Sequence, residues 1–254
     1  MTEIVGGNRA DPGTPPFPGG VAVTHLRVYD SVGPDGLAGG TPHCHTACTE
    51  AYAVIGGRGR LLTYGADGYR STALEPGSFA WFTPGTIHRL VNESGDLEIL
   101  VLMANAGLPE AGDLVITFPD EVMADPAAYR AAAKLDPGGV ATDGSDAAAR
   151  ARRDLAVVGL DELLHRGPEG LERFYERAAA LVAPQVASWR PTWEAGPLAA
   201  ALATGEALDA LASGGHDHLR SSGVHSLPPP PEVRRYGCCG ILGVIQPAGV
   251  DGPS

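Results

Sequence analysis

Two histidines separated by a single residue, His43 and His45, stand early in the chain. In an extended strand, residues i and i+2 project from the same face, so this spacing places two imidazoles side by side. A turn over Thr46–Thr49 would bring the carboxylate of Glu50 toward the pair, and a later strand-like segment supplies a third imidazole, that of His88. Three imidazoles and one carboxylate are typical ligands of a divalent first-row transition metal.

The segments that must position these groups are short, rich in strand-forming residues, and separated by turn residues. They fall at 21–30, 58–65, 69–74, 76–82, 86–92 and 97–103. Asp67 and Gly68 form a typical hairpin turn between the second and third of these segments. No helical segment interrupts the series, which favours an antiparallel barrel or sandwich over alternating strands and helices. The glycine cluster at 56–59 is followed by another strand, so it does not fit a dinucleotide-binding loop.

Strand alternation also predicts which side chains surround the metal ligands. Tyr52 and Val54 share the face of Glu50, so we expect both to line the cavity. In the last strand Glu98 should face outward, and the residues then expected inside are Leu97, Ile99, Val101 and Met103. The pattern leaves open which of the aromatic residues at 79–82 point inward. A mostly apolar cavity favours a small organic substrate over a phosphorylated or highly charged one.

Beyond residue 120 the pattern becomes helical. Asp125 is a predicted N-cap, and Pro126 follows at the first helical position. Amphipathic helices are predicted at 160–164, 168–182 and 197–212. A late apolar run at 235–245 fits either a strand or a packed tail. We expect this half of the chain to pack on the barrel and to narrow the entrance of its cavity.

The two groups of ligands lie in motifs that resemble those of the cupin family. The first family motif, G-x5-H-x-H-x3–4-E-x6-G, is matched at His43, His45, Glu50 and, within one residue, Gly56 or Gly57, with a loose match at Gly40. The second, G-x5-P-x-G-x2-H-x3-N, is matched at Gly77, Gly85, His88 and Asn92, with the proline shifted to Pro84. The resemblance covers approximately residues 20–118.

The resemblance implies a mainly β fold, a small antiparallel β-barrel or jelly roll, followed here by a helical C-terminal extension. The expected divisions are an N-terminal arm at 1–20, a cupin barrel at 21–118 and the extension at 119–254, with a linker near 136–146. It also implies one metal, held by His43, His45, Glu50 and His88. Iron, manganese, nickel, copper, cobalt and zinc all suit these ligands, and the sequence does not select among them.

The segment 48–56, CTEAYAVIG, is similar to the TEA-F/Y-x-V-x-x-G segment of quercetin-dioxygenase-like cupins. This similarity implies an O2-using dioxygenase, in which the metal binds an enol or catechol together with O2. Glu50 and Tyr52 are the predicted catalytic residues, because a carboxylate ligand that detaches can act as a base. Two alternatives stay open: a non-redox isomerase, cyclase or lyase whose metal polarises a carbonyl, and a cupin that binds a small ligand without converting it.

Composition excludes several other classes. The chain has 254 residues, with 18 Lys and Arg against 30 Asp and Glu, giving a formal net charge of −12. This charge opposes binding to nucleic acid or to an anionic membrane. There is no apolar run long enough to span a membrane and no secretory signal, so we predict a cytoplasmic protein. Four cysteines without a CxxC pair do not indicate a structural zinc site.

Other candidate groups have simpler interpretations. His216, His218 and His225 lie in a segment rich in glycine and serine, which favours a solvated loop over a second metal site. Cys238 and Cys239 are expected to pack in an apolar tail. Unpaired sheet edges, together with the apolar segment GILGVI at 240–245, predict a homodimer.

Overall fold

The computed structural model describes residues 17–135, 146–227 and 235–245. Its strands are β1 (Ala22–Val28), β2 (His43–His45), β3 (Glu50–Gly56), β4 (Gly59–Gly65), β5 (Gly68–Leu74), β6 (Phe79–Phe82), β7 (Ile87–Asn92), β8 (Glu98–Met103), β9 (Leu114–Ile116), β10 (Arg235–Tyr236) and β11 (Gly240–Ile245). Its α-helices are α1 (Asp120–Met123), α2 (Pro126–Ala133), α3 (Asp146–Val182), α4 (Val186–Trp193) and α5 (Ala199–Ala212). Short 3-10 helices are η1 (Pro18–Gly20), η2 (Ala183–Gln185) and η4 (Asp217–Ser221), and η3 (Glu194–Leu198) is a π-helical turn.

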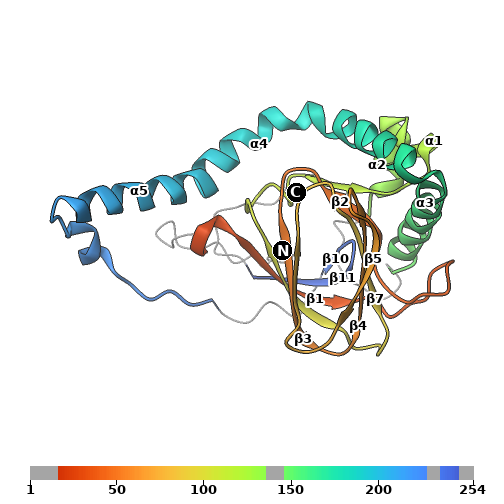
Figure 1. Cartoon of the computed structure of the whole chain (residues 1–254), viewed down its shortest axis with the longest axis horizontal. Helices are drawn as coiled ribbons and strands as arrows, with labels where there is room; N and C mark the ends of the chain where they lie inside the picture. The colour runs from red at the N-terminus through yellow and green to blue at the C-terminus, as the bar shows by residue number, and fades with distance from the viewer. Residues whose placement is uncertain (1–16, 136–145, 228–234, 246–254) are drawn as a thin grey trace, which may run out of the picture.

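The strands form two antiparallel sheets that pack face to face, with helices over one end of the sandwich (Figure 1). One sheet has six strands in the order β10-β11-β1-β8-β3-β6, and the other has five in the order β5-β4-β7-β2-β9. The predicted fold class, an antiparallel β-sandwich followed by a helical extension, is confirmed. The predicted hairpin is present too, because β4 pairs with β5 along its whole length and Gly68 takes the positive φ of 81° that its turn requires.

The alternation of side chains along each strand correctly predicted which residues point into the sandwich. The four residues expected inside from β8 are between 0 and 8% exposed, whereas Glu98 lies on the outer face and pairs with Arg27. His25 is on that outer face as well, at 3.1 Å from the Glu98 carboxylate. The sequence did not show which aromatic residues of 79–82 point inward. In the structure Phe82 is buried, and Phe79 and Trp81 point outward.

The apolar run near the C-terminus is a strand of the barrel itself. Residues 240–245 form β11, which pairs antiparallel with β1 from Val23↔Ile245 to Val28↔Gly240. The barrel predicted at 21–118 is therefore corrected to include a strand from the segment assigned to the extension. The rest of that division stays a prediction. Residues 1–16 of the expected arm and 136–145 of the expected linker lie outside the described residues.

Helix α3 covers the sandwich and is longer than predicted. It begins at Asp146 and includes both expected segments, with a break at Gly167, whose φ is 60°. The N-cap at α2 is confirmed, because the Asp125 side chain accepts a hydrogen bond from the Ala127 amide. Helix α3 lies very close to the barrel: a methyl group on Gly159 would come within 2.2 Å of the Thr117 carbonyl oxygen. Glycine at this position therefore permits the contact.

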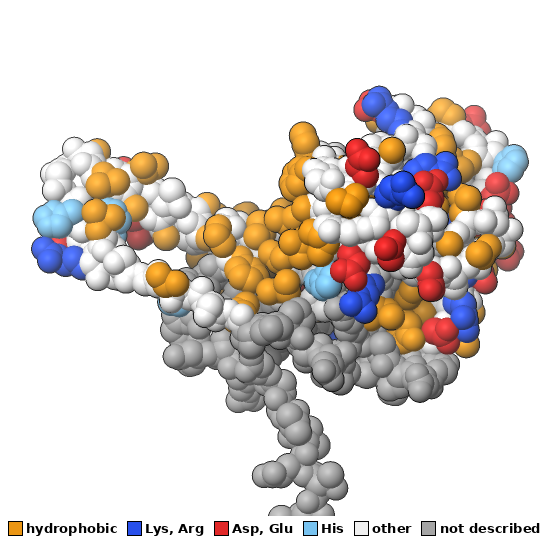
Figure 2. Space-filling model, turned by 90° about the horizontal axis from the view of Figure 1, so that it is seen from below, with side chains coloured by type: hydrophobic (Ala, Val, Ile, Leu, Met, Phe, Trp, Pro, Cys, Tyr) orange, Lys and Arg blue, Asp and Glu red, His pale blue; other side chains and the backbone are white. Residues whose placement is uncertain are grey.

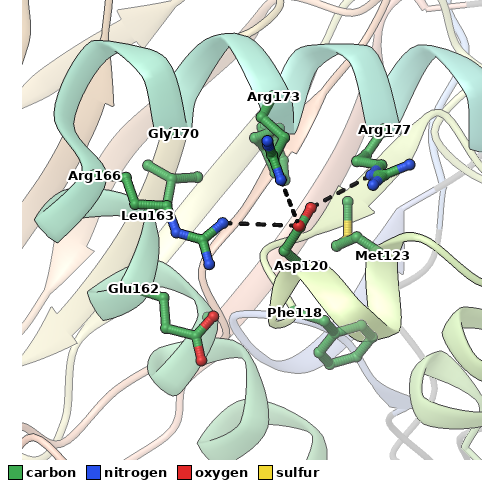
Figure 3. Close-up of a pocket in the computed structure, with 11 residues that line it drawn as sticks. Phe118, Asp120, Met123, Glu162, Leu163, Arg166, Gly170, Arg173 and Arg177 are labelled. Atoms are coloured by element: carbon green, nitrogen blue, oxygen red, sulfur yellow. Dashed lines mark hydrogen bonds and ion pairs between the residues drawn. The ribbon is translucent and has the colours of Figure 1, made fainter.

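The second half of α3 is tied to α1 by charged groups around a small pocket (Figure 3). Asp120 accepts hydrogen bonds from Arg173 and Arg177, at 3.1 and 3.3 Å, and Arg166 lies 3.7 Å away. Burial opposes ionisation of Asp120, but these arginines hold its pKa below the ordinary value. The arginines are partly exposed, so the ion pairs set the orientation of the helix more than they stabilise it.

Helices α4 and α5 extend away from the sandwich as a projecting arm (Figure 1). The segment predicted to be helical at 197–212 is helical, but no residue of α5 is buried. The base of the arm touches η1, where a methyl group on Gly20 would come within 2.7 Å of Pro197 Cα. The expected packing on the barrel thus holds for α3 and fails for α5. None of the described helices is both long enough and apolar enough to cross a membrane.

The close approach at Gly159 gives a direct test of this packing. Gly159→Ala should lower the free energy of unfolding by about 1–3 kcal/mol, because the added methyl group collides with backbone atoms of the barrel. Gly205→Ala on α5 is the matched control, since nothing lies within 4 Å of its added methyl group. That control should be neutral or stabilising by up to about 1 kcal/mol. Urea unfolding of both variants measures the difference, and equal effects would contradict the packing.

Candidate metal centre

The four predicted ligands meet inside the sandwich. His43 and His45 come from β2 and His88 from β7, and His43 and His88 are direct register partners across these strands. Glu50 comes from β3 in the opposite sheet. All four side chains are buried, with exposures of 1 to 5%. One ligand atom from each residue lies within 4.8 Å of all the others.

The turn between β2 and β3 lies where the sequence predicted it. It is held by hydrogen bonds to Asp113, a residue far away in the sequence. The carboxylate of Asp113 accepts hydrogen bonds from the amides of Thr46, Ala47 and Cys48, at 2.9, 2.7 and 3.1 Å. The turn before β7 is fixed in the same region, because the Gly85 amide donates to the His45 carbonyl at 2.8 Å. These bonds hold the ligand-bearing strands in register.

Backbone carbonyls orient two of the three imidazoles. Nδ1 of His43 donates to the Thr41 carbonyl at 2.8 Å, and Nδ1 of His88 donates to the Thr86 carbonyl at 3.0 Å. Each ring then presents the lone pair of its Nε2 to the interior, and the two Nε2 atoms lie 3.1 Å apart. Two lone pairs facing each other at this distance repel, and a cation that both of them bind removes the repulsion.

The remaining ligands complete this cluster. The Glu50 Oε2 atom lies 3.1 Å from His88 Nε2 and 3.4 Å from His45 Nε2. Among the described residues, Oε2 of Glu50 has no hydrogen-bond partner, although it is fully buried. A buried carboxylate oxygen without a donor is strongly destabilised unless a cation compensates its charge. The four residues therefore fit a divalent metal ion, whose identity the donor atoms leave open.

The pKa values of three of the predicted ligands are shifted in different ways by their surroundings. Burial, reinforced by the neighbouring His88 and His45, lowers the pKa of His43 well below its ordinary value. Burial opposes ionisation of Glu50, but His88 and His45 hold its pKa well below the usual range. Burial also opposes protonation of His45, yet Asp113 and Glu50 raise the pKa of this residue to about 9. At neutral pH, His43 is thus neutral, Glu50 is ionised, and His45 carries a proton until a metal displaces it.

Sequence reasoning missed Asp113, which precedes β9. Its Oδ2 atom lies 3.4 Å from Nδ1 of His45, and its side chain is fully buried. A carboxylate behind a ligating histidine fixes the ring orientation and increases its basicity. No motif marks Asp113, because it reaches His45 through the pairing of β2 with β9. The only signal in the sequence is an acidic residue directly before a short apolar segment.

Cys239 also lies nearer the centre than its sequence indicated. The residue packs as predicted, with 7% exposure, and it lies beside Tyr52 and Glu50. Burial, followed by the charge of Glu50, raises the pKa of the Cys239 thiol. Strand β11 therefore brings a thiol to the wall of the predicted metal site, which no local pattern could reveal.

Aromatic side chains separate the ligands from a cleft at the barrel mouth. Tyr52 is fully buried, as predicted, with its ring 5.3 Å from Phe82, and Phe82 lies 4.3 Å from His88 between ring centroids. On the far side of Phe82 is a cavity of about 630 Å³ between β5 and β6, the edge strands of the two sheets. Tyr175 of α3 lines this cavity and donates a hydrogen bond to the Gly85 carbonyl at 3.0 Å. The extension thus forms part of the rim.

The other candidate groups do not join the centre. In the part of the chain that the structure describes, His216, His218 and His225 belong to no group of potential metal ligands. Cys44 points away from the ligands, as strand parity requires, and is buried where a second, apolar cavity lies beneath α3. Burial raises the pKa of the Cys44 thiol to about 12, so it stays protonated at neutral pH.

The fold and the cluster together define a jelly-roll β-sandwich whose buried group of three histidines and one glutamate fits a divalent metal ion. Residues 31–103 match the sequence model of the cupin domain. This part of the chain is therefore a cupin domain, as its two motifs predicted. No curated protein sequence matches the chain.

Several solved structures are similar to part of the chain. A sugar 3,4-ketoisomerase, QdtA from Thermoanaerobacterium thermosaccharolyticum, is 14% identical over 32% of this chain and 57% of its own, with a TM-score of 0.28. A variant of oxalate decarboxylase from Bacillus subtilis is 18% identical over 41% of this chain and 27% of its own, with a TM-score of 0.34. A cupin protein from Bacteroides fragilis is 20% identical over 34% of this chain and 65% of its own, with a TM-score of 0.25. Each match spans less than two thirds of the other chain.

Replacing one ligand tests the centre. His88→Ala should lose most of the bound metal, with an affinity at least about 100-fold weaker, because outer groups alone can cost 10–100-fold. His165→Ala is the control, since that histidine is exposed on α3. Elemental analysis of both purified variants measures the metal content. Wild-type stoichiometry in His88→Ala would show that the ligand set is wrong.

The raised pKa of His45 makes metal binding depend on pH. At pH 7 its Nε2 carries a proton in chelator-treated protein, so binding of each metal ion should release about one proton. The apparent affinity should rise about tenfold per pH unit from 7 toward 9 and level off above the pKa of about 9. Calorimetry in buffers of different ionisation enthalpy measures the released protons. An affinity independent of pH across this window would contradict the assignment.

Proposed function

We propose that this protein is a metal-dependent cupin enzyme that acts on a small organic substrate with O2 as the second substrate. The observation that carries the proposal is a buried three-histidine, one-glutamate cluster separated by a single aromatic ring from an open cleft. Four protein ligands leave one or two positions open on a five- or six-coordinate metal. When bound there, iron, manganese, nickel, copper or cobalt would supply Lewis acidity and a route for electrons to O2, whereas zinc would supply Lewis acidity alone.

The chain's own residues would move the proton in this reaction. Glu50 is ionised at neutral pH, and we assign it as the base that accepts the hydroxyl proton of an enol or phenol. Burial, followed by the negative charge of Glu50, raises the pKa of Tyr52 well above its ordinary value, so its hydroxyl stays protonated and donates a hydrogen bond to bound substrate. That hydroxyl has no hydrogen-bond partner among the described residues, which leaves it available for this role.

The cleft supports a neutral or weakly polar substrate. Its inner wall is formed by Leu61, Ala80 and Phe82, and hydroxyl groups of threonines lie around it. The one arginine of its lining, Arg70, pairs with Asp67 at 3.4 Å, so its charge is largely offset. Such a cleft favours an aromatic or enolic compound over a phosphorylated one. Phe82 would exclude water from the ligands and would have to shift for the substrate to reach them.

We also propose that the protein is a cytoplasmic homodimer, as its composition and sheet edges predicted. The segment expected to mediate the assembly, 240–245, is already paired with β1 of the same chain. Edge strand β6, with Phe79 and Trp81 on its outer face, is a better candidate. The predicted partners are thus a small-molecule substrate and a second copy, without nucleic acid or membrane.

One observation also fits a non-redox isomerase, cyclase or lyase. An ionised Glu50 and a protonated Tyr52 lie on the same face of β3, and this acid–base pair could transfer protons without O2. The two functions differ in one measurable respect, the consumption of O2.

Measuring O2 uptake by metal-loaded protein with a panel of enols and catechols tests the proposal. One or more substrates should be consumed with equimolar O2, and His88→Ala should abolish this uptake. Tyr52→Phe should retain the metal but react at least about 100-fold more slowly, because a proton-transfer or hydrogen-bonding group is lost. Metal-dependent turnover without O2 would instead support the isomerase or lyase, and binding without turnover would support a ligand-binding cupin.

A further inference from the structure

The projecting arm ends in a helix, α5, whose leucines are largely exposed. Leu202, Leu208 and Leu211 of α5 are 59, 62 and 51% exposed, and no residue of this helix is buried. Its charged residues are Glu206 and Asp209 alone. A 14-residue helix of this kind is marginal in water, so its leucines indicate a surface that covers them.

A second apolar surface lies on the outer face of the six-stranded sheet. Phe79 and Trp81 of edge strand β6 are 57 and 69% exposed, and Ile55 on neighbouring β3 is 47% exposed. The strand registers continue this surface across the sheet. One row, from β6 through β3, β8 and β1 to β11, consists of Trp81, Ala51, Leu102, Val23 and Ile245. Every residue of this row is apolar, whereas Arg27 and Glu98 lie farther along the same face, so it is this row that is suited to packing against a helix.

The base of the arm and the start of this sheet meet at a corner. η1 leads directly into β1 of the sheet, and the base of the arm contacts η1. Figure 2 shows apolar side chains gathered between the arm and the body of the molecule. The segments outside the described residues, 1–16, 136–145, 228–234 and 246–254, contain no Leu, Phe, Trp or Tyr. Their large apolar side chains are Met1 and Ile4 alone, too few to cover both surfaces.

We propose that a second copy of the chain fills this corner, with α5 of each protomer packed on the outer sheet face of the other. A two-fold axis makes both contacts at once, because each copy offers one arm and one sheet. The large apolar side chains involved each expose about half of their surface or more. They are Ile55, Phe79 and Trp81 on the sheet, and Leu202, Leu208, Leu211 and Leu219 on α5 and the following η4. Together they amount to roughly 800 Å² per chain, about what each partner of a standard interface buries.

This inference rests on the proposed homodimer and gives it a geometry that differs from simple pairing of sheet edges. An edge-to-edge dimer would leave α5 exposed, whereas the clasped arrangement covers it. The clasped arrangement would also connect α3, and with it the barrel mouth, to the interface, since α3 continues into α4 of the arm through η2. The arm and the rim of the cleft would then be fixed to the same interface.

Single charged substitutions on the two surfaces test the arrangement. Wild-type protein at micromolar concentration should have about twice the 26.1 kDa chain mass by light scattering. Leu208→Glu on the arm and Trp81→Glu on the sheet should each give a monomer, because each buries an unpaired charge at the interface. Val158→Glu is the matched control, an exposed valine on α3 outside both surfaces, and it should stay dimeric. Metal content should equal wild type in all three, which shows that they fold.

Hydrogen exchange of α5 then separates a clasped dimer from the alternatives. Its amides should be protected in wild type and should lose at least about tenfold of that protection in Trp81→Glu, although the substitution lies on another element. A monomeric wild type overturns the proposal, as does a dimer that survives Leu208→Glu or an α5 that is unprotected in the wild-type dimer. O2 uptake is measured separately, so failure of the dimer and failure of the enzymatic proposal are distinguishable.

Discussion

The convergence of three imidazoles and a carboxylate in a dry interior is the constraint on which this structure depends. His43 and His88 face each other with their Nε2 atoms 3.1 Å apart, and Glu50 adds a negative charge at 3.1 Å from His88. Buried here, the charge of Glu50 must be compensated by a cation, either the protonated His45 or a bound metal ion. The two sheets, the turn closed by Asp113 and the carbonyls of Thr41 and Thr86 all serve to hold this arrangement.

The sequence predicted those parts of the centre that follow from local rules. The alternation of a strand fixed the faces of His43, His45 and Tyr52, and the spacing of two motifs joined them to Glu50 and His88. Asp113 could not be predicted in this way, because its contact with His45 depends on which strands become neighbours. For the same reason, the position of Cys239 beside Glu50 could not be predicted. An amphipathic pattern likewise shows that a helix has an apolar face but not what covers that face, so α3 and α5 looked alike in sequence and packed differently.

The extension belongs to the barrel through buried polar groups. The guanidinium of Arg153 in α3 is 1% exposed and donates to the carbonyls of Ser31 and Val32, at 2.6 and 3.0 Å. These bonds tie α3 to the loop before β2 and give the buried guanidinium its hydrogen-bond acceptors. Farther along the same helix, Tyr175 bonds to Gly85 at the rim of the cleft. One helix thus supports both the loop that leads to the metal ligands and the entrance to them.

Strand β11 has a consequence for how the chain folds. Its residues pair with β1 across more than 200 positions of sequence, so closing this part of the sheet requires ordering almost the entire chain. Contacts of such separation form late and slow folding, because the entropy of the intervening chain is lost before they contribute. Until β11 arrives, one edge of β1 is open to pairing with other chains. The part of the site beside Glu50 that Cys239 forms, directly before β11, is therefore ordered last. A metal ion present during synthesis would meet the four predicted ligands before this part of their surroundings is in place.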